Sequence, residues 1–396
     1  MVSGLVGEVT LPGGDQPYTE ELRGNMNWHH RQRRIGIVFG ALALLAAACG
    51  APTTSGTTAS AATAKSAADF GGMSALESEA KKEGKLNVIA LPPDWANYGA
   101  IITAFTAKYG IPIDSANANG SSQDEVNAVT QLGVSNRAPD VLDIGMAVAL
   151  ANTNLFAPYQ VSTWKDIADS QKEPTGLWFQ DYGGYMSIGY DSSKVPTITS
   201  LADLKGSAFK GKVALNGDPT KANAALNGVM MAALGNGGSL DNIAPGVDFF
   251  ANLNKTGNFV PVQATTATVK NGTTPVVFDW DYLSQSHGTD VPTWKIFVPS
   301  DAVLGGYYAQ AISKTAPHPA AARLWEEFLY SDAGQNLWLK GGARPVRMPA
   351  LAKAGTIDKA AAAALPPVSG TPKFLSPDQA TAAKTYLAGH WAQAIG

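Results

Sequence analysis

Two carboxylates and two large rings follow directly after an apolar run in the stretch "VVFDWDYL". Residues 276–278 predict a buried strand. Four residues of a different kind come next: Asp279, Trp280, Asp281 and Tyr282. Acids beside a core strand need partners. Carboxylates pair with ammonium groups, and the face of an aromatic ring attracts a cation by roughly 0.5–2 kcal/mol where water is excluded. The stretch therefore predicts part of a binding site for a positively charged group.

The segments on both sides of this strand alternate between strand and helix patterns. Strands are expected in "KLNVIAL", "IPIDSA", "DVLDIG" and "GKVALNGDP", with helices such as "ANYGAIITAFTAKYG" between them. A capping box from Ser122 to Glu125 predicts the start of another helix. Such alternation is typical of an α/β fold with a largely parallel sheet. Pro and Gly gather at 183–196 and 300–306, where we place two crossings between two lobes.

In open α/β sheets, ligands bind beyond the carboxyl ends of the strands, where backbone amides and helix N-termini are free. The residues that follow the expected strands, or lie at the expected crossings, are rich in acids and rings. We expect a cleft for a small organic cation to be lined by Asp94, Trp95, Tyr98, Ser121, Ser122, Tyr182, Tyr185, Asp218, Asp279, Trp280, Asp281, Tyr282, Tyr307 and Tyr308.

Some of these residues also have purely structural interpretations, which stay open. Ser121 and Ser122 fit a helix cap. Asp218, which precedes a proline, fits a helix start. Tyr182 and Tyr185 fit packing beside a glycine-rich hinge.

The N-terminal part of the chain has the pattern of an export signal. Arg31, Arg33 and Arg34 precede an apolar run at 35–48, which ends in small residues before Cys49. The run is short for a membrane span, and a basic start followed by such a run is typical of a signal peptide. The ending "AAAC" resembles a bacterial lipobox, in which the cysteine carries the lipid and becomes the mature N-terminus.

The N-terminal region is therefore expected to have two parts. Residues 1–48 form the signal peptide, and Met26 stands where such a signal begins, which favours a start-site extension over 1–25. Residues 49–70 form the lipidated cysteine and a flexible tether, because small and hydroxyl residues cannot bury a core. We expect the protein to be anchored by lipid to the outer face of the cytoplasmic membrane.

Composition and missing motifs argue against several classes of function. The chain has 396 residues and a net charge of −3, which gives no sign of nucleic-acid binding. It has no P-loop, no HExxH and no nucleophile elbow, so we expect no enzyme, no cofactor and no metal site. The alternative from another class is an extracytoplasmic hydrolase, whose base would be His287 or His318.

The order of these segments, over roughly residues 74–396, resembles the extracellular solute-binding lipoproteins of bacterial ABC importers. Several stretches carry the resemblance: "LESEAKKEGKLNVIAL", "SLADLKGSAFKGKVALNGDP", "GGYYAQAISKTAPHPAAARLWEEFLYSDAGQNLWLKGG" and "ARPVR". The resemblance is to class II periplasmic binding proteins, in the group that binds polyamines, ferric iron, thiamine or aminoalkylphosphonates.

This resemblance implies two lobes, each a mostly parallel sheet flanked by helices, joined by a two-segment hinge. The first lobe would hold residues 71–185 and 306–396, and the second lobe 186–305. It also implies a monomer that catalyses no reaction and delivers a small-molecule solute to an ABC permease. A sensor subunit that feeds a receptor is a further alternative.

The resemblance also bears on the solute. Iron-binding relatives carry a consecutive tyrosine pair at the end of a second-lobe strand, whereas "DWDYL" keeps only Tyr282. Polyamine-binding relatives place an acid among the aromatics of the return strand, whereas "GGYYAQAI" has none, so Asp279 or Asp281 would have to serve. An aminoalkylphosphonate could use these acids together with the serine pair 121–122. We therefore expect a polyamine or an aminoalkylphosphonate-like solute, with ferric iron or thiamine as alternatives.

Overall fold

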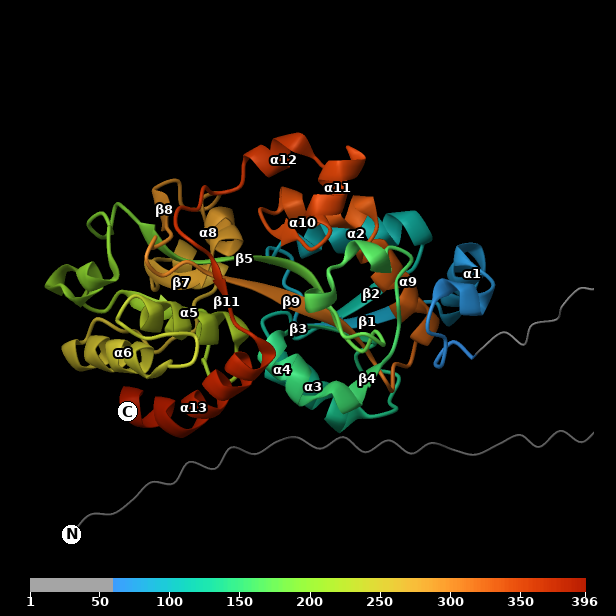
Figure 1. The fold of residues 1–396 in the computed structure, drawn as a ribbon, viewed down its shortest axis with the longest axis horizontal. Coiled ribbons are helices and arrows are strands. Elements are labelled where there is room, and N and C mark those ends of the chain that lie inside the picture. Colours follow the sequence, from blue (N-terminus) through green and yellow to red (C-terminus); the bar gives the residue numbers. More distant parts are fainter. Residues whose placement is uncertain (1–59) are drawn as a thin grey trace, which may run out of the picture. The chain divides into compact units, whose positions relative to one another are not determined.

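Two long strands, β5 (Phe179–Asp191) and β9 (Leu304–Ser313), run across the middle of the fold and pair antiparallel (Figure 1). Past Tyr185, β5 leaves β9 and pairs with two other strands. These are β7 (Val276–Trp280) and β8 (Trp294–Phe297), both antiparallel to β5. One strand therefore joins the two groups of elements on either side of the crossing.

The computed structural model describes residues 60–396, which belong to one compact unit. The expected signal peptide, Cys49 and the first part of the expected tether lie outside the described residues. Among helices in the described part, we find none with the length and apolar character needed to cross a membrane.

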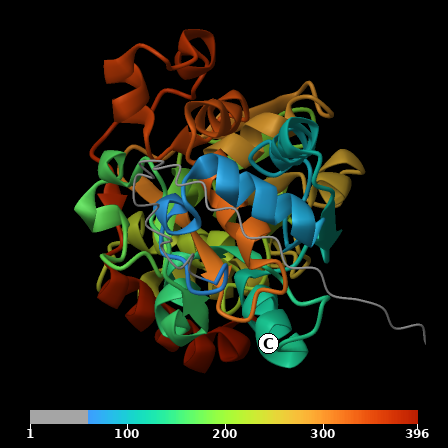
Figure 2. The ribbon, with the colours of Figure 1, turned by 90° about the vertical axis from the view of Figure 1, so that its right-hand side faces the viewer.

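The elements on one side of the crossing form what we call the first lobe. Its strands are β1 (Leu86–Ile89), β2 (Ile113–Ala116), β3 (Val141–Gly145) and β4 (Phe156–Ala157). Its helices are α1 (Met73–Glu83), α2 (Tyr98–Tyr109), α3 (Ser122–Leu132), α4 (Met146–Ala151), α9 (Pro319–Leu329) and α10 (Asp332–Lys340). β1 and β2 pair in parallel, while β3 and β4 pair antiparallel with β9. α1 packs against α9 at the end of the unit that faces the viewer in Figure 2.

The elements on the other side form the second lobe. It contains β7, β8 and β6 (Val213–Leu215), and β6 pairs in parallel with β7. Its helices are α5 (Asn223–Leu234), α6 (Ala244–Thr256), α7 (Thr266–Lys270) and α8 (Asp281–His287). Every residue of α5 after Asn223 is buried. This follows from its sequence, which is apolar or small on all sides, as in a helix that runs through a core.

The C-terminal part of the chain runs from the crossing to the top of Figure 1 and then down to the bottom, where residues 377–395 lie beneath both lobes. Its elements are β10 (Arg344–Pro345), α11 (Met348–Ala354), α12 (Lys359–Ala363), β11 (Lys373–Phe374) and α13 (Pro377–Ile395). β10 pairs with β5, and β11 pairs with β9. α13 contacts both lobes, because Lys384 donates to Gln123 of α3 (3.2 Å) and Asn254 of α6 donates to the carbonyl of Ile395 (2.7 Å).

Short 3-10 helices occupy several connections. They are η1 (Ala67–Phe70), η2 (Thr153–Leu155), η3 (Trp164–Asp166), η4 (Asp169–Gln171), η5 (Leu201–Lys205) and η6 (Ser207–Phe209).

The expected α/β class is confirmed, but the sheets are mixed rather than mostly parallel. β1–β2, β6–β7 and β9–β11 pair in parallel. The long strands β5 and β9 run in opposite directions through the crossing, so they and most of their neighbours pair antiparallel. The alternation of helix and strand along the chain does not reveal this, because strand direction depends on which strands become neighbours.

Two local expectations were wrong. The N-cap of α3 is Ser121 and not Ser122, since the Ser121 hydroxyl accepts from the Asp124 amide and the Asp124 carboxylate accepts from the Ser121 amide (2.9 Å). Part of the expected tether is also folded. Ala64 is buried, and the Arg323 guanidinium donates to its carbonyl oxygen (2.8 Å), so residues 60–70 include part of the core.

Candidate functional site

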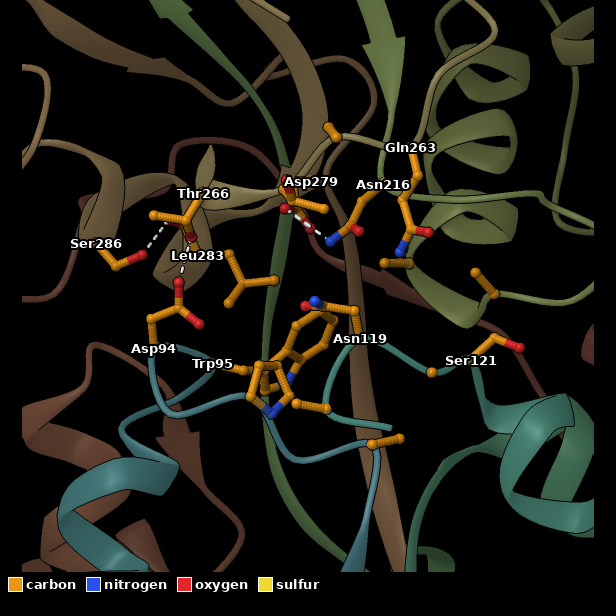
Figure 3. Close-up of a pocket in the computed structure, with 18 of the residues that line it drawn as sticks. Asp94, Trp95, Asn119, Ser121, Asn216, Gln263, Thr266, Asp279, Leu283 and Ser286 are labelled. Atoms are coloured by element: carbon orange, nitrogen blue, oxygen red, sulfur yellow. Dashed lines mark hydrogen bonds between the residues drawn. The ribbon is translucent and has the colours of Figure 1, made fainter. Parts of the chain in front are cut away.

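A cavity of about 500 Å³ lies between the two lobes (Figure 3). On the first-lobe side it is lined by the loops that follow β1 and β2, the start of α3 and Asp143 within β3. On the second-lobe side it is lined by the end of β6, the starts of α5 and α7, and the end of β7 with α8. The cavity therefore lies at the carboxyl ends of four strands, the usual position for ligands in α/β folds.

The structure brings six of the predicted site residues to this cavity: Asp94, Trp95, Ser121, Ser122, Asp279 and Tyr308. The other eight predicted residues do not line it: Tyr98, Tyr182, Tyr185, Asp218, Trp280, Asp281, Tyr282 and Tyr307. These eight side chains are absent from the lining because the chain turns away from the cavity at some positions and because others pack behind the cavity wall.

Asp279 is the one acid of β7, and its buried carboxylate faces the cavity (Figure 3). Its Oδ2 atom accepts a hydrogen bond from the side-chain amide of Asn216 at the end of β6 (2.9 Å). Its Oδ1 atom accepts from the backbone amide of Trp280 (2.8 Å). Burial raises the pKa of Asp279 to about 7, and these two hydrogen bonds partly oppose the rise.

Asp281 was expected beside Asp279 in the site, and this expectation was wrong. The chain changes from strand to helix after Trp280, so Asp281 becomes the first residue of α8 and leaves the face that Asp279 occupies. Its Oδ2 atom lies 2.7 Å from Nη1 of Arg344. Its Oδ1 atom accepts from the backbone amide of Tyr185 (3.0 Å). A paired and buried carboxylate of this kind is not free to bind a solute.

The aromatic residues at the crossing support the cavity wall from behind. Trp95 lines the cavity, and its Nε1 atom donates to the hydroxyl oxygen of Tyr182 (2.7 Å). The hydroxyls of Tyr182 and Tyr98 both donate to Oδ2 of Asp143, at 2.8 and 2.9 Å. Tyr182 also stacks on Tyr308, with ring centres 5.9 Å apart. Tyr98 and Tyr182 therefore position Trp95, Tyr308 and Asp143, although neither of the two lines the cavity.

The remaining predicted residues have structural roles. Trp280 and Tyr282 are buried and stack on each other, with ring centres 6.4 Å apart. The Tyr185 ring lies under the guanidinium of Arg344, at 4.6 Å from its centre. Asp218 accepts from the backbone amide of Thr220 (2.9 Å) in the turn before α5. Tyr307 pairs with Gly183 in the crossing and is also absent from the cavity lining.

Two buried acids of the first lobe were not predicted. Glu125 and Asp143 both line the cavity, and Oε2 of Glu125 accepts from the backbone amide of Asp143 (3.0 Å). Burial raises the pKa of Glu125, and it raises the pKa of Asp143 to about 6. The acid inside the apolar stretch "DVLDIG" was an available signal for Asp143. The sequence predicts only a helix-cap role for Glu125.

The charged groups of the cavity are mostly acids. Five carboxylates line it: Asp94, Glu125, Asp143, Asp279 and Asp290. Among the described lining residues there is one lysine, Lys270, and its Nζ atom is already paired with Asp290 (2.8 Å). Burial lowers the pKa of His287 to about 4, so this histidine is neutral at pH 7. The described lining contains no arginine.

Side-chain amides and hydroxyls form most of the other polar lining, and most of these were also not predicted. They are Asn119, Asn216, Asn223, Gln263, Thr265, Thr266 and Ser286. Thr266 donates to the carboxylate of Asp94 from the opposite lobe (Figure 3). Thr265 caps α7, a short helix with no periodic apolar pattern to announce it.

A metal site and a hydrolase site are not supported by the described residues. Within residues 60–396, no three His, Cys, Asp or Glu side chains are grouped in a way that could hold a metal ion. His318 does not line the cavity, and its Nδ1 atom lies 2.9 Å from the buried carboxylate of Asp140. His287 lines the cavity but packs edge-on against Trp294.

Residues 130–380 match the family model of bacterial extracellular solute-binding proteins. The chain belongs to this family. The resemblance expected from the sequence is confirmed, and the protein is an extracytoplasmic solute-binding protein of the kind that serves ABC importers. A search of curated protein sequences finds no match.

Solved structures of solute-binding proteins share this fold. Iron-bound HitA from Pseudomonas aeruginosa is similar with a TM-score of 0.58 and 20% identity, over 79% of this chain and 99% of HitA. AfuA from Actinobacillus pleuropneumoniae, with fructose-6-phosphate bound, gives a TM-score of 0.62 and 15% identity, over 78% and 98%. AgtB from A. tumefaciens R10, in complex with agropinic acid, gives a TM-score of 0.62 and 16% identity, over 79% of this chain and 98% of AgtB. These likenesses establish the two-lobe α/β fold of a periplasmic binding protein for this solute-binding protein.

Proposed function

We propose that this solute-binding protein captures a small amine-bearing solute between its lobes and delivers it to an ABC permease. The observation that carries the proposal is the charge of the cavity. Asp94, Glu125, Asp143 and Asp279 face it without a basic partner among the described lining residues, since Lys270 is paired with Asp290. Glu125, Asp143 and Asp279 are buried, whereas Asp94 is exposed. Buried carboxylates without a counter-charge are costly, and an ammonium group of the solute would supply that charge.

The two lobes would close around the solute. Solute binding shifts an open–closed equilibrium only through its different affinity for the two states. The hydrogen bond between Asp94 and Thr266 joins the lobes at the mouth of the cavity, and it supports a closed form in which both lobes contact the solute. A micromolar affinity corresponds to about −8 kcal/mol, enough to cover a closure that costs a few kcal/mol.

A thermal-shift screen of the purified protein tests the amine. The panel contains putrescine, spermidine, 2-aminoethylphosphonate, thiamine and ferric citrate. An amine at 100 times its Kd adds about 2.7 kcal/mol to the free energy of unfolding, which raises the melting temperature. The proposal fails if no amine raises the melting temperature while ferric citrate does.

Three further statements rest on the sequence and belong to the same proposal. We assign residues 71–185 and 306–396 to the first lobe and 186–305 to the second, and the change of partner along β5 after Tyr185 supports this boundary. The mature protein would be a monomer. It would be held to the membrane by lipid on Cys49, and a Cys49→Ser variant should then move from the membrane fraction to the soluble extracytoplasmic fraction.

A further inference from the structure

The neutral polar groups of the cavity indicate what the rest of the solute looks like. Four side-chain amides line it: Asn119, Asn216, Asn223 and Gln263. An amide presents a donor and an acceptor on the same group. A solute hydroxyl also donates and accepts, so it can satisfy both ends of an amide. A bare methylene chain between two ammonium groups can satisfy neither.

Two of these amides are available for a solute. The side chains of Asn119 and Gln263 form no hydrogen bond with any residue in 60–396, whereas the Asn216 amide is held by Asp279. Asn119 precedes α3 in the first lobe, and Gln263 precedes α7 in the second lobe. They approach the cavity from opposite sides in Figure 3. A molecule with several hydroxyls could therefore bond to both lobes at once.

The aromatic residues of the cavity add a flat apolar surface. Trp95 and Tyr308 both line it and meet edge to face, with ring centres 5.7 Å apart at 82°. The hydrogen bond from Trp95 to Tyr182 fixes the indole before any solute arrives. The C–H face of a saturated ring packs well on such a surface, and amides around the edge would bond to its hydroxyls.

The volume of the cavity and the charge of its lining restrict the class of solute further. The cavity of about 500 Å³ is much larger than a short diamine or an aminoethylphosphonate would fill. A phosphonate or phosphate would meet carboxylates on both lobes and no arginine among the described lining residues. The single lysine of that lining is paired with Asp290.

We propose that the solute is an amine on a polyhydroxylated carbon skeleton without a phosphate, such as an amino sugar or an amino alditol. This inference rests on the proposed function, because it keeps the ammonium group among the carboxylates. It adds that the amides of Asn119 and Gln263, together with the Trp95–Tyr308 surface, recognise the hydroxylated skeleton.

Titration calorimetry with matched probes tests separately the need for the amine and the need for the hydroxyls. Glucosamine, galactosamine and glucamine carry both the amine and the hydroxyls. Glucose, galactose and sorbitol carry hydroxyls alone, and putrescine and spermidine carry amines alone. Glucosamine 6-phosphate adds the anion. We expect at least one amino sugar or amino alditol to bind at least tenfold more tightly than its amine-free partner, than either polyamine and than the phosphate ester.

The other outcomes distinguish the two proposals. A polyamine that binds as tightly as every amino sugar and alditol overturns this inference and leaves the proposed function standing. Neutral sugars that bind as tightly as their amino counterparts overturn the proposed function and, with it, this inference. If no probe with an amine and hydroxyls binds, the inference is wrong.

Two exposed amides allow a test that does not disturb the fold. Asn119→Leu and Gln263→Leu should each weaken binding of the amino sugar or alditol at least tenfold and leave weak putrescine binding unchanged. Gln393→Leu is the matched control, because Gln393 is an exposed residue of α13 away from the cavity. Equal losses for the hydroxylated and the plain amine would contradict a role of these amides in recognising hydroxyls.

Discussion

Nη1 of Arg344 lies 2.7 Å from Oδ2 of Asp281, and the Asp281 side chain is fully buried. Arg344 belongs to β10, which pairs with β5 at the crossing, and Asp281 begins α8 of the second lobe. The pair therefore connects the crossing to the second lobe. Asp281, which the sequence predicts to be in the binding site, instead stabilises the junction between the crossing and the second lobe.

Replacing Asp281 should affect stability more than solute binding. Asp281→Asn removes one partner of a buried ion pair and leaves the Arg344 charge without compensation, which costs about 3–5 kcal/mol. Chemical denaturation should show this loss. Calorimetry at a temperature where the variant is folded should show solute affinity within a few-fold of the original. A large loss of affinity in a variant of unchanged stability would place Asp281 in the site after all.

Replacing Asp279 should give the opposite pattern. Asp279→Asn keeps the shape, but its single oxygen can accept from only one of the two donors, the Asn216 side chain and the Trp280 backbone amide. It also removes a charge that faces the cavity. We expect solute affinity to fall roughly 10- to 100-fold, about 1.4 kcal/mol for each factor of ten. Asp248→Asn, an exposed residue of α6 outside the cavity, is the control and should bind normally. Affinity that matches this control would remove Asp279 from the site.

The stability effect of Asp279 should depend on pH. Burial raises its pKa from 3.8 to about 7, so the folded protein binds this proton more tightly than the unfolded chain does. Its contribution to the free energy of unfolding is therefore largest in acid and is lost as the pH rises from about 4 to 7. Relative to the original protein, Asp279→Asn should become progressively more stable over this interval. Urea denaturation of both proteins without solute, at several pH values, measures the difference.

Other buried side chains of the ligand-free protein also titrate in this pH range and change its stability. The measurement therefore compares the original protein with the Asp279→Asn variant. Burial raises the pKa of Asp143 to about 6 and raises those of Glu125 and Asp181, with the same sign as Asp279. Burial lowers the pKa of His287 from 6.5 to about 4, so its contribution is lost as the pH falls through that range. These contributions cancel in the difference between the two proteins. If the stability of Asp279→Asn relative to the original protein stays constant or falls as the pH rises, the raised pKa of Asp279 is contradicted.

The crossing should not tolerate side chains at its glycines. A Cβ atom on Gly183 would lie 2.1 Å from the carbonyl oxygen of Gly306, a backbone atom of the paired strand. Gly183→Ala should therefore force β5 and β9 apart and cost about 3 kcal/mol. Gly389→Ala in α13 meets nothing within 4 Å and should stabilise the protein by roughly 0.5–1 kcal/mol. Similar melting temperatures for the two variants would mean that the crossing strands can separate at little cost.

The sequence identified the elements better than it identified the site. Apolar runs bounded by turns located β1, β3 and β7, and the rule that ligands bind at the carboxyl ends of strands correctly brought Asp279, near the end of β7, to the cavity. The same rule failed for Asp281, because it cannot tell where a strand gives way to a helix. It also missed Asp143, which lies in the middle of β3. Gln263 and Thr265 belong to a loop and a short helix cap, and their position depends on tertiary packing that no local pattern encodes.

The direction of the strands could not be predicted for a related reason. Helices between strands predicted parallel pairs, and β1–β2 and β6–β7 agree. β5 and β9 are separated by the whole second lobe in the sequence, yet they are neighbours in the sheet. Their antiparallel pairing depends on the chain returning through the same crossing.

Helix α13 contacts both lobes at once. Its Trp391 packs against Phe250 and Phe259 of the second lobe, while its Lys384 reaches Gln123 of the first. Any motion that separates the lobes must therefore break one of these two sets of contacts or carry the helix along with one lobe. A chain cut short before residue 376 would keep its lobes in register only through the crossing strands and the pairs beside them, and its lobes should separate more widely.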